Sequence, residues 1–179
     1  GRAPTGLAPR YINYKENIMT NQTNHINHTN HINHINKTAI IIGASRGIGA
    51  AIAKKLASCG YNLSLCCRNS SDRLKALADE LHCAYGIEVL CYTGNVGDFF
   101  FAKDMVTKTI SHFGHIDVLI NNAGISHIGL LSDMTPDEWN NIVAINLTGV
   151  FNFTKLVTPY MVADKCGRLL QISSVWGNV

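Results

Sequence analysis

From Lys37 onward, short β-rich runs alternate with stretches whose apolar residues recur at helical spacing. Strands separated by helices in this way are parallel, because a right-handed crossover returns the chain to the same end of the sheet, and the helices then cover both faces. The predicted strands are residues 38–42, 62–67, 89–92, 118–121 and 169–173. The alternation therefore predicts an α/β fold with a doubly wound parallel sheet.

Residues with capping chemistry mark where the intervening helices begin and end. The first helix follows a glycine loop and ends at Gly60, Ser70 or Ser71 can cap the second, and the third begins at Asp98 and ends near Gly114. Residues 135–138 (TPDE) have the pattern of a capping box with proline at the first helical position. They open a long helix that we expect to end near Pro159.

Residues 24–36 read NHINHTNHINHIN, a triplet repeat with histidine at positions 25, 28, 31 and 34. A three-residue period matches neither a helix face nor strand alternation, and asparagine disfavours both structures. The closely spaced imidazoles could bind a divalent metal loosely, but a low-complexity segment that captures metal only incidentally is the simpler interpretation. We therefore predict a disordered leader over residues 1–36 and one folded domain over residues 37–179.

Composition and charge exclude several classes of function. Of the 179 residues, 46% are hydrophobic and 15% are charged, which suits a globular domain. The formal net charge of +3 offers no electrostatic footprint for nucleic acid or an anionic membrane. No uninterrupted apolar run approaches the ~20 residues that span a bilayer, and no apolar region near the start resembles a signal peptide. We expect a cytoplasmic protein without nucleic-acid or membrane partners.

The six cysteines form no C-x-x-C pair, and two of them are adjacent; they lie at positions 59, 66, 67, 83, 91 and 166. This spacing suits neither a disulfide framework nor a zinc site. We interpret the cysteines as buried, reduced thiols and predict no metal site.

The stretch IIIGASRGIGAAIAKKLA places Gly43, Gly47 and Gly49 between the first predicted strand and its helix. Glycines there permit a tight turn and let a pyrophosphate approach the free N–H groups at the helix N-terminus. A glycine triplet alone is a weak signal, but this one follows a strand and opens a helix within the first βαβ unit. The context predicts a Rossmann-type dinucleotide site in the domain of residues 37–179.

The end of the second strand favours one dinucleotide over another. An NAD site has an acidic residue there, which accepts a hydrogen bond from the ribose 2′-hydroxyl. This chain has Cys67 and Arg68 at that point, and Arg46 lies in the glycine loop. Two guanidinium groups without a carboxylate suit a 2′-phosphate, because a bidentate charged contact is strong. Two solvated surface arginines are the alternative, and we expect NADP(H).

Polar residues also follow the later strands. VLINNAGI (118–125) ends the fourth strand in Asn121 and Asn122 and leads to Gly124, and ligands of open α/β sheets bind beyond the carboxyl ends of the strands. Ser174 follows the fifth strand at the same edge, where a serine can donate to a carbonyl oxygen or merely cap a turn. No G-x-S-x-G elbow surrounds Ser174, which argues against a hydrolase nucleophile.

The long helix contains a polar residue within an apolar stripe. Asn146 lies among residues that recur at helical spacing: Trp139, Ile142, Val143, Val150, Phe153 and Val157. A buried amide without hydrogen bonds costs about 1–3 kcal/mol. We therefore predict a buried Asn146 with a functional role, and a satisfied core asparagine is the alternative.

These motifs together resemble the short-chain dehydrogenases/reductases. GASRGIG, NNAG, AINLTG and QISS stand in that family's order and spacing, and the resemblance covers residues 37–179. It implies that Asn146 and Ser174 belong to the family's Asn-Ser-Tyr-Lys catalytic set. Ile42 and Asn95 depart from the family's usual threonine and aspartate. The cofactor site implied by the resemblance is lined by Gly43, Ser45, Arg46, Ile48, Arg68, Asn95, Val96, Asn122, Ala123 and Gly124.

The resemblance implies NADPH-dependent reduction of a ketone that is either a small molecule or carried by a protein. By sequence texture the 3-oxoacyl-acyl-carrier-protein reductases are nearest. A narrower likeness, in GISHIGLLSDMTPDEWN (124–140) and in SSVWG with its Trp176, is to reductases of the 5-aminopentanone group on elongation factor P. Family members form tetramers through the helix that corresponds to residues 136–158, which implies a homo-oligomer.

The family places its catalytic tyrosine about thirteen residues past the serine and its lysine four further on, which would be near positions 187 and 191. The last tyrosine in this chain is Tyr160, which precedes Ser174. We therefore expect the N-terminal part of an enzyme, inactive by itself, with an exposed sheet edge and exposed apolar surface. A non-catalytic nucleotide-binding module is the alternative from another class.

Overall fold

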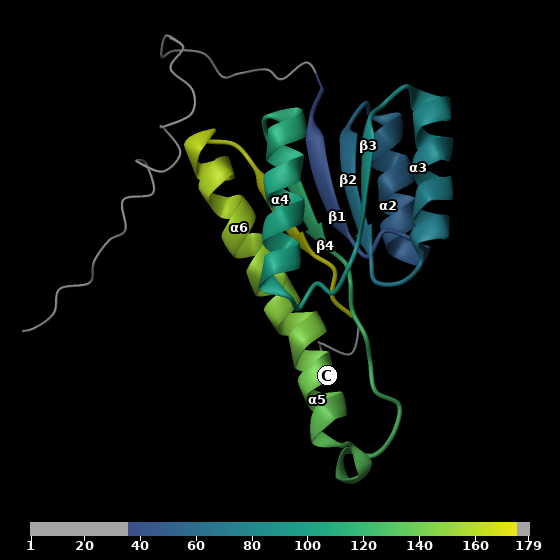
Figure 1. Ribbon diagram of the computed structural model, residues 1–179, viewed down its shortest axis with the longest axis vertical. Helices are drawn as coiled ribbons and strands as arrows, with labels where there is room; N and C mark the ends of the chain where they lie inside the picture. Colours follow the sequence, from purple (N-terminus) through teal and green to yellow (C-terminus); the bar gives the residue numbers. More distant parts are fainter. Residues whose placement is uncertain (1–35, 175–179) are drawn as a thin grey trace, which may run out of the picture. The chain divides into compact units, whose positions relative to one another are not determined.

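The computed structural model describes residues 36–174, so the predictions for residues 1–35 and for Trp176 lie outside the described residues. Five parallel strands form one sheet in the order β3-β2-β1-β4-β5 (Figure 1). The strands are β1 (Thr38–Ile42), β2 (Asn62–Cys67), β3 (Val89–Thr93), β4 (Val118–Asn121) and β5 (Arg168–Gln171). The predicted fold class, a doubly wound parallel sheet of Rossmann type, is confirmed.

Helices cover both faces of this sheet. Helices α2 (Gly47–Ser58) and α3 (Ser71–Tyr85) pack on one face, and α4 (Phe99–Phe113) and α6 (Gly149–Ala163) pack on the other (Figure 1). Successive side chains of a strand point to opposite faces. Ile41 of β1 therefore joins the α2/α3 core, and Ile40 joins the α4/α6 core. All of β1 is buried, as expected for a central parallel strand.

Capping residues begin two helices as predicted. Asp98 is the N-cap of α4, and its carboxylate accepts from the N–H of Phe100 at 2.8 Å. In α5 (Pro136–Val143), Thr135 Oγ1 accepts from the N–H of Glu138 at 3.2 Å, and Glu138 Oε2 accepts from the N–H of Thr135 at 2.8 Å. The predicted capping box is therefore confirmed. Ser70 is the N-cap of α3, but its side chain makes no capping hydrogen bond.

The predicted long helix is divided and extends further than expected. It consists of α5, a π-helical turn η3 (Ala144–Thr148) and α6, which continues through Pro159 to Ala163. Proline inside a helix costs about 3 kcal/mol. Val157 and Met161, on either side of Pro159, are buried in the α4/α6 core. Their burial offsets this cost, so the helix does not end at the proline.

Strand β5 forms one edge of the sheet, and all four of its residues are exposed. It is shorter than predicted because its partner β4 ends at Asn121, which pairs with Gln171. Leu169 and Leu170 each leave 42% of their surface exposed. The expected exposed edge with apolar side chains is therefore present in this part of the chain.

One stretch of the described residues, Pro136–Ala163, has the length and apolar character of a membrane-spanning helix, although no uninterrupted apolar run reaches that length. A single such helix is weak evidence for a membrane span, because a core helix of a soluble protein can be equally long and apolar. Phe153, Val157 and Met161 of this stretch pack in the α4/α6 core. Packing against the sheet thus accounts for the apolar side chains of its inner face.

All six cysteines are free thiols, as predicted, but most are not buried. Cys66 and Cys67 lie in β2 and are buried, whereas Cys59, Cys83, Cys91 and Cys166 are exposed. The prediction of burial is therefore wrong for four of them. Cys59 is the C-cap of α2, for example, where the chain turns at the surface.

Candidate functional site

The candidate site lies where β1, β2 and β4 end, because the carboxyl ends of parallel strands meet at one edge of a sheet. Ile42 pairs with Cys66 of β2 and with Asn121 of β4. Directly after β1, the N–H groups of Gly43 and Ala44 both donate to the carbonyl oxygen of Cys66, at 3.0 and 2.9 Å. The glycine loop therefore starts against β2 and leads straight into α2.

The three glycines of this loop are required for different reasons. Gly43 has a φ of +79°, and a Cβ there would lie 2.9 Å from the Cα of Ala123. A Cβ on Gly49 would overlap the carbonyl oxygen of Gly43 and would lie 2.7 Å from Nδ2 of Asn122. Gly47 has a φ of +55°, but a Cβ there would meet nothing within 4 Å. Gly43 and Gly49 permit close packing of the main chain, whereas Gly47 faces open space.

The N-terminus of α2 at Gly47 fits an anionic group. Arg46 is the N-cap residue, its side chain makes no capping hydrogen bond, and the first turn of α2 contains no acidic residue. The first N–H groups of a helix and its dipole both favour a phosphate at that end. Ser45 precedes this turn and is half-buried, and Ile48 within it is exposed. These residues could hold the pyrophosphate of a dinucleotide.

Asn122 connects the end of β4 to the glycine loop through hydrogen bonds. Its N–H donates to the carbonyl oxygen of Ile42 at 3.2 Å, and its Nδ2 donates to the carbonyl oxygen of Gly43 at 2.8 Å. Ala123 packs against Gly43, and Gly124 follows at the surface. The structure therefore brings these residues beside the glycine loop, as the sequence predicts.

Asn121 differs from that prediction, because its side chain points into the protein. It is buried, and its Nδ2 donates to Oγ1 of Thr154 in α6 at 3.3 Å. Its Oδ1 is buried without a hydrogen-bond partner among the described residues. Asn121 therefore links β4 to α6 and does not border the crevice through its side chain.

The two arginines stand at the edge where β1 and β2 end. Arg46 precedes α2, Arg68 directly follows β2, and both side chains are exposed. Nη1 of Arg68 donates to Oδ1 of Asn141 in α5 at 3.4 Å, a weak contact that a phosphate could replace. Exposed guanidinium groups at this edge can make charge-assisted hydrogen bonds to a 2′-phosphate.

The loop between β3 and α4 contains two further predicted cofactor residues. Asn95 is exposed, and its Oδ1 accepts from the N–H of Gly97 at 3.0 Å. The amide oxygen closes a local turn and keeps one lone pair for a ligand. The side chain of Val96 is buried, and a Cβ on Gly149 would lie 2.9 Å from its Cγ2. Val96 thus offers a ligand its main chain rather than its side chain.

Asn146 lies in the π turn and holds the chain that follows β4. Its Oδ1 accepts from the N–H of Ile125 at 2.9 Å, and its Nδ2 donates to the carbonyl oxygen of Ile125 at 2.8 Å. The prediction that Asn146 is buried in an apolar stripe is wrong, since Asn146 is exposed and Trp139 is 55% exposed. The reason for Trp139 is that α5 extends beyond the sheet (Figure 1), and the reason for Asn146 is that the buried face of the π turn runs through Ile145. Single π turns often occur at functional sites.

Ser174 lies three residues beyond β5 and is exposed at the same edge. The N–H of Ile172 donates to the carbonyl oxygen of Asn121 at 2.9 Å, which keeps this part of the chain beside β4. The topology therefore places Ser174 at the edge that also carries Asn122 and the glycine loop.

Two thiols of the sheet, that of the buried Cys66 and that of the exposed Cys91, are poor nucleophiles. Burial raises the pKa of the Cys66 thiol to about 12, although a backbone hydrogen bond with Gly43 opposes the shift. Partial desolvation of its sulfur likewise raises the pKa of Cys91, although the residue as a whole is exposed, to about 11. A thiolate is the reactive form, so neither cysteine can act as a nucleophile at neutral pH. Within residues 36–174, no group of three His, Cys, Asp or Glu side chains could hold a metal ion.

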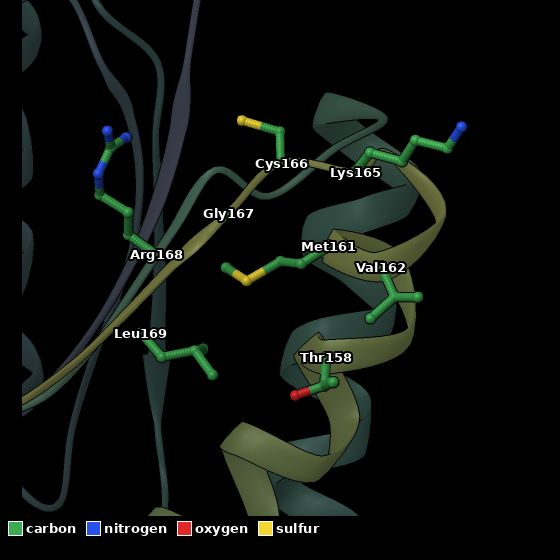
Figure 2. Close-up of a pocket in the computed structure, with 8 residues that line it drawn as sticks. All are labelled: Thr158, Met161, Val162, Lys165, Cys166, Gly167, Arg168 and Leu169. Carbon is green, nitrogen blue, oxygen red and sulfur yellow. The ribbon is translucent and has the colours of Figure 1, made fainter.

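A surface groove between the end of α6 and the start of β5 is separate from this site (Figure 2). The side chain of Met161 points from α6 toward β5, and Lys165 and Arg168 are also among the lining residues. The groove lies at the amino end of β5, opposite the carboxyl edge where the glycine loop begins. None of the predicted site residues lines it.

One buried polar residue near the site was not predicted from the sequence. Asn152 in α6 is 2% exposed, and its Nδ2 donates to the carbonyl oxygens of Val96 and Gly97 at 3.3 and 3.2 Å. Its position three residues after Gly149 and four before Leu156 places it on their helix face. This position in the helix could have indicated from the sequence that Asn152 is buried.

Comparison with known proteins identifies the family. A model of the family "short chain dehydrogenase" matches residues 37–179. The chain belongs to the short-chain dehydrogenases. The matched residues include every strand, the glycine loop and the π turn described above.

Two curated relatives of this short-chain dehydrogenase illustrate the range of similarity. The 3-oxoacyl-[acyl-carrier-protein] reductase FabG of Staphylococcus epidermidis is 40% identical over 141 residues, covering 79% of this chain and 57% of that protein. D-beta-hydroxybutyrate dehydrogenase of Cupriavidus necator is 36% identical over 143 residues, covering 80% of this chain and 55% of that protein. The chain therefore spans somewhat more than half the length of these relatives.

Solved structures of two oxidoreductases share the fold. A metagenomic short-chain oxidoreductase in complex with NADP has a TM-score of 0.76 at 35% identity, covering 80% of this chain and 64% of that one. The alcohol dehydrogenase of the archaeon Thermococcus sibiricus, complexed with 5-hydroxy-NADP, has a TM-score of 0.71 at 35% identity, covering 75% of this chain and 57% of that one.

Proposed function

We propose that this chain binds NADP(H) and forms the cofactor-binding part of a ketone reductase. Two observations carry the proposal. The N-terminus of α2 at Gly47 is open and has no side-chain cap, and Arg68 takes the place of an acidic residue at the end of β2. The two solved relatives in complex with NADP or its derivative support this choice of cofactor.

Each part of the edge has a proposed role toward the cofactor. Gly43, Gly47 and Gly49 admit the pyrophosphate to the α2 N-terminus, and Arg46 and Arg68 pair with the 2′-phosphate. The oxygen of Asn95 accepts from the adenine amino group, while Asn122, Ala123 and Gly124 border the nicotinamide end. The bound cofactor supplies a hydride to the substrate carbonyl.

Ser174 and Asn146 are proposed for the substrate end. The hydroxyl of Ser174 donates to the ketone oxygen and so stabilises the charge that develops there. The side chain of Asn146 fixes the segment that begins at Ile125, and its turn of helix would help to order a proton-relay water. From the family resemblance, the proton donor is a tyrosine near position 187, assisted by a lysine near position 191 that lowers the phenol pKa.

The proposed substrate is a 3-oxoacyl group or a similar ketone, which the likeness to the staphylococcal reductase supports. A second candidate is the 5-aminopentanone group carried by elongation factor P, which the sequence of residues 124–140 favours. In the structure, Ile128 and Leu131 of this stretch are 97% and 78% exposed. An apolar surface next to the site suits contact with a carrier protein. Turnover of a 3-oxoacyl thioester and of modified elongation factor P by the extended chain would separate the two.

We also propose that the whole protein is a cytoplasmic homo-oligomer. Leu147, Phe151 and Val162 lie on the outer side of η3 and α6 and are exposed, and family tetramers pack this helix against a partner. Covering them would remove apolar surface from water. Free thiols at the surface suit a reducing compartment. Sedimentation of the extended chain tests the oligomer, and a monomer at micromolar concentration would contradict it.

The first test compares binding of NADP⁺ and NAD⁺ to the 179-residue chain by calorimetry. We expect NADP⁺ to bind at least about tenfold more tightly, because the 2′-phosphate gains charge-assisted hydrogen bonds. Arg68→Ala should remove most of this preference, and Lys75→Ala, a change on the exposed face of α3, should leave it intact. Equal affinities for both dinucleotides would refute the preference for NADP, and no binding would refute the proposal.

The second test concerns catalysis. The gene is sequenced past codon 179, and the chain is extended through the tyrosine and lysine if they are present. We expect ketone-dependent oxidation of NADPH by the extended chain only, and its loss in Ser174→Ala. The rival function, a non-catalytic nucleotide-binding module, predicts binding of NADP⁺ but no turnover by either chain.

A further inference from the structure

Asn152 lies where the loop between β3 and α4 meets α6. Its side chain is almost fully buried, and Nδ2 donates to two main-chain oxygens of the loop, those of Val96 at 3.3 Å and Gly97 at 3.2 Å. A buried amide that satisfies two loop carbonyls holds the main chain in one position, because its loss would leave buried acceptors without donors. Asn152 thus fixes the loop that carries Asn95.

Close packing of the main chain holds the same loop on the same helix. A Cβ on Gly97 would lie 2.9 Å from the carbonyl oxygen of Ala144, and a Cβ on Gly149 would lie 2.9 Å from Cγ2 of Val96. Ala144 is the first residue of the π turn, and Gly149 directly follows its last residue. The loop therefore rests on both ends of that turn.

The π turn also contacts the other half of the proposed cofactor site. Asn146, at its centre, holds both polar main-chain atoms of Ile125. One turn of helix therefore positions two segments, the loop of Asn95 on the proposed adenine side and the chain after Gly124 on the proposed nicotinamide side. The distance between these two segments therefore depends on the contacts that each makes with the π turn.

We propose that Asn152 is a positioning residue for the cofactor: it fixes the main chain of Val96 and Gly97 on the π turn and so sets the place of Asn95 relative to Asn146. The inference rests on the proposed NADP(H) site. Without the amide donor, the Asn95 turn moves independently of the helix, and the adenosine half of the cofactor loses its contact. The pyrophosphate site at the start of α2 is untouched.

The test replaces Asn152 by leucine, which has the same branching and the same number of side-chain heavy atoms but no donor. Val157→Ala is the matched control, because it loosens the packing of α6 without touching the loop. Calorimetry measures binding of NADP⁺ and of 2′,5′-ADP, which is the adenosine half alone. We expect Asn152→Leu to weaken both by about tenfold and Val157→Ala to change either by less than about twofold, although both variants melt at lower temperature.

Hydrogen–deuterium exchange gives a readout that does not depend on a ligand. In Asn152→Leu, peptides covering residues 94–98 should exchange about tenfold faster than in the unchanged protein, and peptides covering 43–49 should keep their rates. If Asn152→Leu does not fold, Asn152→Ser takes its place with the same expectations in both measurements.

The outcomes separate the inference from the proposed function. If the unchanged chain binds no NADP⁺, the proposed function fails, and the exchange rates of residues 94–98 still decide whether Asn152 fixes the loop. If it binds NADP⁺ and Asn152→Leu binds both ligands equally well, the inference is wrong and the proposed function stands. Equal weakening in Val157→Ala also overturns the inference, because the loss would then reflect helix stability alone.

Discussion

The glycine loop, residues 43–49, and the 125–135 segment both enter the candidate site, but different contacts hold them. The glycine loop is held by its main chain, with Gly43 and Ala44 bonded to the Cys66 carbonyl and with Gly49 packed against the Gly43 carbonyl. The 125–135 segment is held by side chains, chiefly the amide of Asn146 on Ile125. The close main-chain packing at Gly43 and Gly49 requires glycine, whereas a side-chain attachment lets the rest of its segment vary.

His127 shows that the second arrangement leaves a buried polar atom unsatisfied. Its Nδ1 is 3.7 Å from Oε1 of Glu138, and a Cβ on Gly129 would lie 2.7 Å from its Nε2. That Nε2 is buried without a hydrogen-bond partner among the described residues. The 125–135 segment thus contains an unsatisfied polar atom, and its apolar side chains Ile128 and Leu131 are largely exposed to solvent. Under the proposed function, this segment would face the substrate and the glycine loop would face the cofactor.

The largest expected effect follows from Gly49→Val, which should break the glycine loop. The first added carbon already overlaps the Gly43 carbonyl, and overpacking of this kind costs about 3 kcal/mol of the free energy of unfolding. NADP⁺ binding should be lost in the same variant. Urea denaturation and calorimetry measure the two effects.

Gly47→Ala is the control for this change, because a Cβ there meets nothing within 4 Å. Its stability cost should be limited to the positive φ, about 1 kcal/mol, while the methyl group enters the proposed pyrophosphate space. A Gly49→Val protein with normal stability would show that main-chain packing does not hold this loop.

The next largest expected effect is a loss of stability at alkaline pH. It comes from Cys66, whose carbonyl oxygen holds the start of the glycine loop. The pKa of Cys66 is raised from 9.0 to about 12 in the folded protein, so above pH 9 the thiol ionises on unfolding but stays neutral when folded. Stability is therefore complete below pH 9 and falls as pH rises toward 12, by up to about 1.4 kcal/mol per pH unit. Urea titrations between pH 8 and 10.5 measure the slope. Cys66→Ala should reduce it, and Cys59→Ala, at an exposed thiol, should not.

Asn146→Ala tests the other side of the comparison. Loss of both hydrogen bonds to Ile125 should lower the free energy of unfolding by about 1–2 kcal/mol. It should also speed hydrogen–deuterium exchange in residues 125–131 while the glycine loop keeps its rates. Asn140→Ala, at an exposed asparagine of α5, serves as the control. Unchanged exchange in residues 125–131 would mean that contacts other than Asn146 fix the segment.

The smallest expected effect is at the end of the 125–135 segment. Thr135→Ala removes the capping box and should cost about 1 kcal/mol. Hydrogen bonds from the Thr135 N–H and hydroxyl lower the pKa of Glu138. The stability that these hydrogen bonds give to the folded protein is fully present above the ordinary carboxyl pKa. It is lost as pH falls through the lowered pKa of Glu138. Acid titration should therefore show a smaller stability loss in Thr135→Ala than in the unchanged chain, and Ser132→Ala should behave as unchanged.

The sequence by itself determined the elements whose signals are local. Strands β1, β2 and β4 have the predicted bounds, and Asp98 and Thr135 begin their helices where capping chemistry places them. The glycine loop was predictable because its three glycines stand between a strand and a helix, and backbone geometry needs no distant partner. These features together suffice for the fold class and for a dinucleotide site at one edge of the sheet.

Only the tertiary structure decided which faces are buried and which side chains meet. Asn146 belongs to an apolar stripe by spacing but is exposed, because the buried face of the π turn runs through its neighbour Ile145. The helix continues through Pro159 because its neighbours are buried, and β5 stops where β4 offers no further partner. Asn152 donates to the carbonyl oxygen of Val96, which precedes it by 56 residues in the sequence. Burial and long-range contact depend on what packs against a residue, and that is a property of the assembled layers rather than of the local sequence.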